Sequence, residues 1–392
     1  MAQRIKIGLI FSNNEAWIGG TYYILNLIQA LRTLPEEKLP HLVIFCDKES
    51  DVKIIKNLQY PYTSFEKLSF QYNIFEKIVN KLSRLVFDKN IITKCHPKHT
   101  VNIVFPFDFQ ESLGNISYRI AWIPDFQEYF LGHFFSKEEL EKRKKHHLRI
   151  IKYNLPIIFS SKVAQAHFNT IYSKAKNQTF ILNFAVSHPE YININSGALL
   201  EKFDITKPYF IAPNQFWIHK NHQVILNSIL HMKENQKILP FQIVFTGKEY
   251  DFRYPEYTQN LKKFVQNNGL VEDVLFLGFI DRLEQLKLMK NALAVVQPSL
   301  FEGWSTVVED AKAMKQILIL SDIEVHREQA RNNKYLFFPP QNALQLSKCI
   351  EDFLNNHVTV NISDNYQKNI EDFGLTFINI LNSVLNNENP LS

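Results

Sequence analysis

Glycine and cysteine are both scarce in this chain of 392 residues, which contains 11 glycines and three cysteines. Three widely spaced cysteines support neither a disulfide framework nor a zinc cluster. No apolar run approaches the roughly 18 residues of a transmembrane helix, and the charged N-terminus is unlike a signal peptide. These absences lead us to expect a cytoplasmic protein. Because glycine is rare, each glycine is a strong indication of where the backbone needs freedom.

Composition excludes further classes of protein. At 45% hydrophobic residues and a net charge of +5, the chain is too apolar and too weakly charged to be disordered or collagen-like. Charge is unevenly divided, with a net of +8 in residues 1–200 and −3 in residues 201–392. The densest basic run, Glu141 to Arg149, is either a solvated helix face or a site for an anionic membrane surface or an acidic substrate.

Short apolar runs alternate with amphipathic segments in two series, a pattern typical of parallel sheets wrapped by helices. The first series has candidate strands at Ile5–Phe11, Leu42–Cys46, Val101–Phe105, Tyr118–Ile123 and Pro156–Ser160, with helices at Thr21–Leu34 and Ser136–Tyr153. The second begins with a strand at Tyr209–Ala212 and a helix at His219–Lys233, and ends with a helix at Glu324–Arg331. We therefore predict an α/β protein of two doubly wound Rossmann-like domains.

The predicted boundaries follow from the break between the two series. The turn-rich stretch from Ser187 to Lys207 separates an N-terminal domain, residues 1–200, from a C-terminal domain, residues 201–372. A closing helix, predicted over Ile362–Leu385, would carry residues 373–392 back toward the first domain. Since ligands of such sheets bind at the carboxyl ends of the strands, we expect the active site in a cleft between the domains.

The first candidate segment runs from Trp17 to Thr21 and places Gly19 and Gly20 between a strand and a helix. Backbone N–H groups there can approach a phosphate or a sugar, and a helix N-terminus favours an anion. The dinucleotide-binding pattern G-x-G-x-x-G is absent, so a plain flexible loop is the alternative.

The second candidate segment, Pro213 to His222, follows a strand and contains Asn214, His219 and Lys220. Lys220 is placed to reach a phosphate. His219 and His222 lack the spacing and the companions of metal ligands, so no metal site is expected, and His222 fits a structural role better. Further along, Gly247 and Gly278 each end a strand, and either position would admit a flat base against the backbone.

The fourth candidate segment, Gln297 to Lys312, gives the clearest signal. Glu302 follows a strand, and a glycine turn through Gly303, Trp304, Ser305 and Thr306 would direct free N–H groups at an anion. Glu309, in the first turn of the next helix, would accept two sugar hydroxyls. The alternative is that Glu309 only interacts favourably with the helix dipole.

Together these turns resemble retaining glycosyltransferases of the GT-B fold, glycosyltransferase family 4. SLFEGWSTVVEDAKA is similar to that family's donor-site signature, in which two glutamates flank a glycine turn. PNQFWIHKNH and SDIEVHREQ resemble a bacterial branch that builds surface polysaccharides, as do WIGGTYY and AWIPDFQEYF in the first half.

The resemblance implies a donor site for a nucleotide sugar in the C-terminal domain. Lys220 and the amides of Gly303–Thr306 would bind the diphosphate, Glu309 the ribose, Glu302 the donor sugar, and Gly278–Phe279 the base. From the first domain, Gly19 and Gly20 would approach the diphosphate and Asp125 would stand near the reacting sugar. Lys220, Glu302 and Asp125 are the predicted catalytic residues.

This sequence departs from the family pattern in two places. The family places seven residues between its glutamates, whereas six separate Glu302 from Glu309, and Asp310 comes next. Asp310 is therefore the alternative second carboxylate, although we favour Glu309. The family also carries an arginine before the lysine, where this chain has Asn214 and Ile218.

The resemblance implies transfer of a hexose or deoxyhexose, with retention and without a metal or other cofactor. The donor would be GDP-mannose or another nucleotide-diphosphate hexose, and the acceptor a glycan or lipid-linked glycan of a surface polysaccharide such as lipopolysaccharide. Attack would be from the front face, and the leaving phosphate would take the acceptor proton. We expect a cytoplasmic enzyme, peripheral at the inner face of the plasma membrane, without nucleic acid as a partner. The alternatives are a nucleotide-sugar epimerase of the same fold and a catalytically degenerate sugar-binding homologue.

Overall fold

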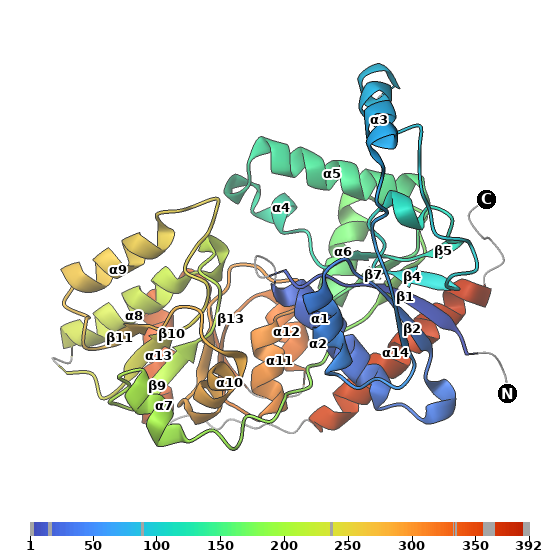
Figure 1. Ribbon diagram of the computed structural model, residues 1–392. Helices are drawn as coiled ribbons and strands as arrows, with labels where there is room; N and C mark the ends of the chain where they lie inside the picture. The colour runs from blue at the N-terminus through green and yellow to red at the C-terminus, as the bar shows by residue number, and fades with distance from the viewer. Residues whose placement is uncertain are drawn as a thin grey trace.

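Two α/β halves lie side by side in the computed structural model (Figure 1). The structure describes residues 4–14, 18–87, 90–235, 238–331, 333, 335–355 and 365–386. Trp17 of the first predicted motif and residues 362–364 of the predicted closing helix lie outside these residues. None of the described helices combines the length and the apolar character that crossing a bilayer requires.

The N-terminal half contains two parallel sheets. The first has the order β3 (Thr63–Glu66), β2 (His41–Phe45), β1 (Lys6–Ile10), β4 (Ile103–Phe105) and β5 (Tyr118–Arg119). The second has the order β6 (Ala121–Ile123), β7 (Ile157–Phe159) and β8 (Thr179–Ile181). The helices of this half are α1 (Ile18–Arg32), α2 (Glu49–Lys56), α3 (Ile74–Phe87), α4 (Gln127–Phe130), α5 (Lys137–Lys152) and α6 (Lys162–Ile171).

The predicted strand Tyr118–Ile123 is wrong as a single element, because the chain changes sheets within it. Ile120 bonds through its amide to Val104 of β4, whereas the next amide, of Ala121, bonds to Pro156 beside β7. Ile120 is buried at this step, so the apolar run is continuous in sequence even though its hydrogen-bonding partners change.

The C-terminal half contains one parallel six-stranded sheet. Its order is β11 (Val274–Phe276), β10 (Gln242–Phe245), β9 (Tyr209–Ala212), β12 (Val295–Gln297), β13 (Leu318–Ser321) and β14 (Leu336–Phe338). The helices of this half are α7 (Ser196–Lys202), α8 (His222–Asn235), α9 (Tyr257–Asn267), α10 (Arg282–Asn291), α11 (Thr306–Ala313), α12 (Glu324–Ala330) and α13 (Ala343–Leu354). Purely apolar strands such as β9 are buried throughout, as expected for a sheet covered on both faces.

The last helix, α14 (Tyr366–Asn386), packs against α1 of the N-terminal half (Figure 1, red and blue). Phe373 and Phe377 are buried in the N-terminal core. A Cβ at Gly374 would lie 2.6 Å from the backbone oxygen of Ala30, so only glycine permits this closeness of the two helices.

Candidate functional site

The pocket that we take as the candidate site is formed where loops at the carboxyl ends of strands from the two halves meet. From the N-terminal half, the loop after β6 contributes Asp125. From the C-terminal half, the loops after β9 and β12 contribute Lys220 and Glu302. The three predicted catalytic residues therefore line one pocket.

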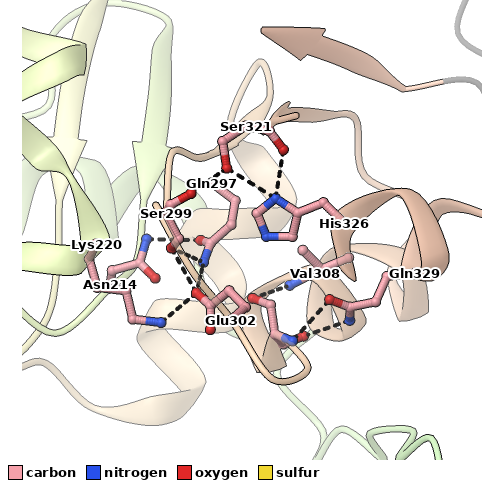
Figure 2. A network of polar contacts seen from close by, with 10 residues as sticks. Asn214, Lys220, Gln297, Ser299, Glu302, Val308, Ser321, His326 and Gln329 are labelled. Carbon is pink, nitrogen blue, oxygen red and sulfur yellow. Dashed lines mark hydrogen bonds and ion pairs between the residues drawn. The ribbon is translucent and has the colours of Figure 1, made fainter. Parts of the chain in front are cut away.

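Glu302 is the centre of a hydrogen-bond network in this pocket (Figure 2). Its Oε1 accepts from Lys220 Nζ at 2.6 Å, from Ser299 Oγ at 2.7 Å and from Gln297 Nε2 at 2.9 Å. The amide oxygen of Gln297 in turn accepts from Asn214 Nδ2 at 2.9 Å. The side chain of Glu302 is thus held in one orientation by residues of two neighbouring strand ends.

The charge of Glu302 is fixed by this network. Burial alone raises the pKa of a carboxyl group, but Lys220 outweighs it and holds the pKa of Glu302 at about 2. Glu302 is therefore a carboxylate at neutral pH, suited to accept hydrogen bonds and unsuited to donate a proton.

Lys220 reaches Glu302 because the chain does not enter α8 where the sequence pattern predicts. Residues Ile218–Lys220 form a 3-10 turn, and Asn221 adopts a left-handed conformation with φ 56° before α8 begins at His222. The side-chain Nδ2 of Asn221 donates to the carbonyl oxygens of Pro298 and Pro340, which stabilises this turn. The predicted helix His219–Lys233 is therefore wrong in its first turn, and this difference places Lys220 in the pocket.

Asp125 is a second carboxyl group of the pocket and is oriented by the amide of Gln127, which donates to it at 2.9 Å. Burial raises its pKa, opposed by this hydrogen bond and by the cation of Arg143. The pocket thus combines one carboxylate that is held ionised with one carboxyl group that binds its proton more tightly than usual.

Gly303 and Trp304 join the two halves. A Cβ at Gly303 would clash with the Pro124 carbonyl oxygen and lie 2.9 Å from Asp125 Cβ, so only glycine permits these loops to touch. The Trp304 indole donates to the Phe184 carbonyl oxygen at 3.0 Å and packs into the N-terminal core. Both residues line the pocket, and both also hold the halves together.

The amides of the glycine turn are not all free for an anion, contrary to the prediction for Gly303–Thr306. The amide of Ser305 donates to Gln329 Oε1 at 2.9 Å, and Ser305 caps α11 through its hydroxyl group. Thr306 begins α11 and lines the pocket together with Ser305.

Glu309, the favoured ribose ligand, lies outside the pocket lining. It is 1% exposed and accepts hydrogen bonds from Tyr366 Oη at 2.7 Å, Lys312 Nζ at 3.1 Å and Gln329 Nε2 at 3.1 Å. These contacts direct its carboxylate toward α14. Asp310, the alternative, lines the pocket instead.

The carboxylate of Asp310 is held by two side chains from elsewhere in the chain, Arg282 and His188. Arg282 Nη2 donates to its Oδ1 at 2.5 Å, and His188 Nε2 lies 3.0 Å from the same oxygen. Burial raises the pKa of Asp310, but Arg282 and His188 outweigh it and lower that pKa. The Arg282 guanidinium also lies 4.9 Å from the centre of the Tyr22 ring of α1, which links the two halves.

The sequence reasoning missed Arg282, although a signal was available. Arg282 follows the helix cap Asp281 at the strand-to-helix turn after β11, the same kind of turn as those that hold Lys220 and Glu302. It lines the pocket and supplies a cation there, in a sequence without the family's arginine before Lys220.

The predicted glycines divide into two groups. Gly19 and Gly247 line the pocket, as does Phe279, whereas Gly20 is buried in the first turn of α1 and Gly278 lies outside the lining. The amide of Gly247 donates to the Gly278 carbonyl oxygen at 2.8 Å, which ties the two strand-end loops together.

The two histidines of the second segment are buried, and burial lowers the pKa of both. His219 lines the pocket, whereas His222 stacks on the Phe216 ring at 4.5 Å between centroids. Within the described ranges, His, Cys, Asp and Glu side chains nowhere gather in a group of three suited to a metal ion.

Comparisons with known proteins show what the chain resembles in sequence and in fold. Residues 200–373 match the family described as Glycosyl transferases group 1. The O-antigen chain mannosyltransferase RfbU of Salmonella typhimurium is 27% identical over 187 residues, which are 45% of this chain and 50% of that protein. The matched segments span half or less of the length of the curated relatives.

Solved structures extend the likeness to nearly the whole chain. HepE of Anabaena in complex with UDP-glucose has a TM-score of 0.68 at 15% identity, over 97% of this chain and 100% of that one. WaaG, a glycosyltransferase involved in lipopolysaccharide biosynthesis, has a TM-score of 0.59 at 10% identity, over 98% and 100%. The chain therefore has the GT-B fold of two Rossmann-like domains, and its residues 200–373 are similar to the Glycosyl transferases group 1 family.

Proposed function

We propose that this chain is a retaining, metal-independent glycosyltransferase that moves a hexose or deoxyhexose from a nucleotide-diphosphate sugar to a glycan acceptor. The observation that carries the proposal is the Lys220–Glu302 pair, 2.6 Å apart, in a pocket built by both domains. The match to a glycosyltransferase family in the half that holds this pair supports the same conclusion.

In the proposed reaction, the bond between the anomeric carbon and the diphosphate oxygen breaks, and the acceptor oxygen bonds to that carbon on the same face. The acceptor proton passes to the leaving phosphate. Negative charge then grows on the diphosphate, where the cation of Lys220 stabilises it. Arg282, also in the pocket, supplies the second cation that the sequence lacks near Lys220.

The other pocket residues each contact a different part of the donor. Glu302 accepts hydroxyl groups of the donor sugar, and Asp125 stands beside the reacting sugar. Asp310, rather than Glu309, accepts the ribose hydroxyls, because Asp310 lines the pocket and Glu309 faces α14. The base lies against Phe279, whose ring is exposed in the lining. No cofactor or metal takes part.

We propose GDP-mannose as the first donor to test, because RfbU is an O-antigen chain mannosyltransferase. The acceptor is proposed to be a growing surface glycan, carried on a lipid. This substrate would place the enzyme at the inner face of the plasma membrane.

The test is a panel of nucleotide-diphosphate sugars, assayed by thermal shift and by release of the nucleotide diphosphate with and without a glycan acceptor. A donor at about 100 times its Kd should stabilise the fold by about 2.7 kcal/mol. Acceptor-dependent release supports the proposal.

Two other outcomes would contradict it. Release of a free sugar without an acceptor identifies an epimerase, and stabilisation without any turnover identifies a degenerate sugar-binding homologue. A Lys220→Met variant, which loses the pocket cation, is the control for release that comes from a contaminating enzyme.

A further inference from the structure

Helix α3 has its polar and apolar faces reversed relative to an ordinary surface helix. The side chains of Asn80 and Ser83 are buried against the protein. Ile74 and Leu85, in contrast, are both 78% exposed. Figure 1 shows α3 projecting beyond the body of the N-terminal half. The exposed fractions of Ile74 and Leu85 show that its apolar face is uncovered.

The inward face of α3 is fixed by polar contacts. Asn80 donates through Nδ2 to the Ile92 carbonyl oxygen and accepts from the Ile92 amide, both at 2.9 Å. Glu76 accepts from Lys94 Nζ at 2.7 Å. The helix is thereby held in one rotational setting, and its apolar side chains cannot turn inward without breaking these bonds.

The outward face forms a continuous apolar stripe. Ile74, Ile78, Leu82 and Leu85 follow the i, i+4, i+8, i+11 spacing that aligns side chains along one face of a helix. Phe75 and Val86 widen the stripe and are more than 70% exposed. A helix of 14 residues is about 21 Å long, so these side chains form one contiguous exposed apolar surface along it. Contiguous exposed apolar surfaces commonly mark sites of interaction with a protein or a membrane.

The charges around the stripe favour one kind of partner. Lys77, Lys81 and Arg84 flank one edge, and residues 67–98 contain seven Lys and Arg against two acids, a net of +5. Helix α5 adds the exposed Lys144 and Lys145 to the same half. An apolar stripe bordered by cations matches an anionic bilayer, with acyl chains below and phosphates beside it. Two copies of so basic a surface would repel each other, which disfavours a dimer.

We propose that α3 docks this chain on an anionic lipid bilayer, lying in the plane of the interface with Ile74, Ile78, Leu82 and Leu85 among the acyl chains. The inference rests on the proposed function in one respect: docking would bring the pocket close to a lipid-linked acceptor. The docking itself needs neither donor nor acceptor.

The test is co-sedimentation with vesicles of phosphatidylethanolamine and phosphatidylglycerol, compared with vesicles of phosphatidylcholine alone. Wild type should bind the anionic vesicles, and high salt should weaken binding. Ile78→Gln/Leu82→Gln/Leu85→Gln should lower the partition coefficient at least about tenfold, since three exposed apolar side chains no longer enter the bilayer. Leu344→Gln, which changes an exposed leucine on α13, is the matched control and should bind like wild type.

A spectroscopic readout tests insertion directly. The indole introduced by Phe75→Trp should shift to shorter emission wavelength on anionic vesicles and be quenched by lipids brominated in the acyl chain. Lys77→Gln/Lys81→Gln should weaken binding to anionic vesicles and leave phosphatidylcholine binding unchanged.

Three outcomes would overturn the proposal. The triple variant could bind vesicles as well as wild type does, or the indole emission could stay unshifted on anionic vesicles. Alternatively, light scattering could show that the wild type is a dimer and the triple variant a monomer. The last would assign the stripe to a second copy. A Lys220→Met variant should still bind vesicles, so loss of transfer activity and loss of docking are separable results.

Discussion

The charge of Lys220 and that of Glu302 stabilise each other in a pocket that shields both from water. Their side chains are 15% and 9% exposed, so neither charge is well solvated without the other. Lys220 keeps the Glu302 carboxylate ionised, and Glu302 orients the ammonium group toward the space between the domains. One contact therefore serves both the proposed chemistry and the stability of the fold.

Lys220→Met is expected to lower turnover by about 10²–10³, the usual effect of removing one group that stabilises a developing charge. It should also destabilise the fold, by up to about 3–5 kcal/mol, because Glu302 is left as an unpaired buried charge. Urea unfolding and steady-state kinetics measure the two effects. Lys220→Met/Glu302→Gln should recover much of the stability and none of the activity. Wild-type turnover in the single variant would contradict the role of Lys220.

Removing the charge of Asp310 should mainly affect donor binding, whereas removing that of the neighbouring Glu309 should mainly affect stability. Asp310→Asn is expected to raise the KM for the donor about tenfold or more, because a carboxylate facing the pocket is lost. Glu309→Gln should leave KM near wild type and lower the free energy of unfolding, since it disturbs the contacts with Tyr366 and Lys312. The reverse pattern would restore Glu309 as the donor ligand.

At the scale of elements, the pocket depends on how closely loops and helices approach one another. The loop after β12 touches the loop after β6 through Gly303, and α14 touches α1 through Gly374. Both contacts join the N-terminal half to a segment from late in the chain. The two glycines therefore set the distance between elements that are far apart in sequence. In this role each glycine lets two parts of the protein approach each other, rather than letting a ligand approach the backbone.

Gly303→Ala tests this role. The added Cβ would clash with the backbone of Pro124, and overpacking of this kind costs about 1–3 kcal/mol. Because the loops must separate, transfer activity should fall by more than about tenfold, as expected when reacting groups are misplaced. Gly132→Ala is the control, since a Cβ there meets no atom within 4 Å. Equal activity of the two variants would contradict the junction role.

At the scale of the whole molecule, buried histidines in both halves make the stability of the fold depend on pH. Burial lowers the pKa of His147 and of His222 to about 3, and that of His326 to about 4. An unfolded histidine has a pKa near 6.5, so below this pH the unfolded chain binds protons that the folded chain does not. Acid therefore favours unfolding.

We expect the free energy of unfolding to fall as the pH drops from about 6.5 toward 4, with each of these histidines adding up to about 1.4 kcal/mol per pH unit. Glu302 adds to the loss below about pH 4.5, where its carboxylate would be protonated in the unfolded chain only. Urea unfolding at pH 7.5, 6.0 and 5.0 measures the slope. His222→Gln and His147→Gln should each reduce it, and an unchanged slope in both would contradict this origin.

Much of the fold follows from local pattern, and the errors occur where tertiary contacts decide. The capping box of Ser136 and Glu139 starts α5 as predicted, because both partners lie within one turn. The strand β9 has the predicted bounds, Tyr209–Ala212. The strand Tyr118–Ile123 and the start of α8 were predicted wrongly, because distant partners, Pro156 and Pro340, set those boundaries.

The sequence by itself determined the alternating α/β pattern and the turns at which strand ends meet helices. Its resemblance to a known family, rather than periodicity, grouped Lys220, Glu302 and Asp125 as one predicted set. Only the tertiary structure decided which of the two adjacent acids faces the pocket. Consecutive residues of a helix point about 100° apart, so Glu309 contacts Tyr366 of α14 while Asp310 lines the pocket. It also decided that α3 presents its apolar face outward. Periodicity shows that a helix has two faces, but only packing determines which face is covered.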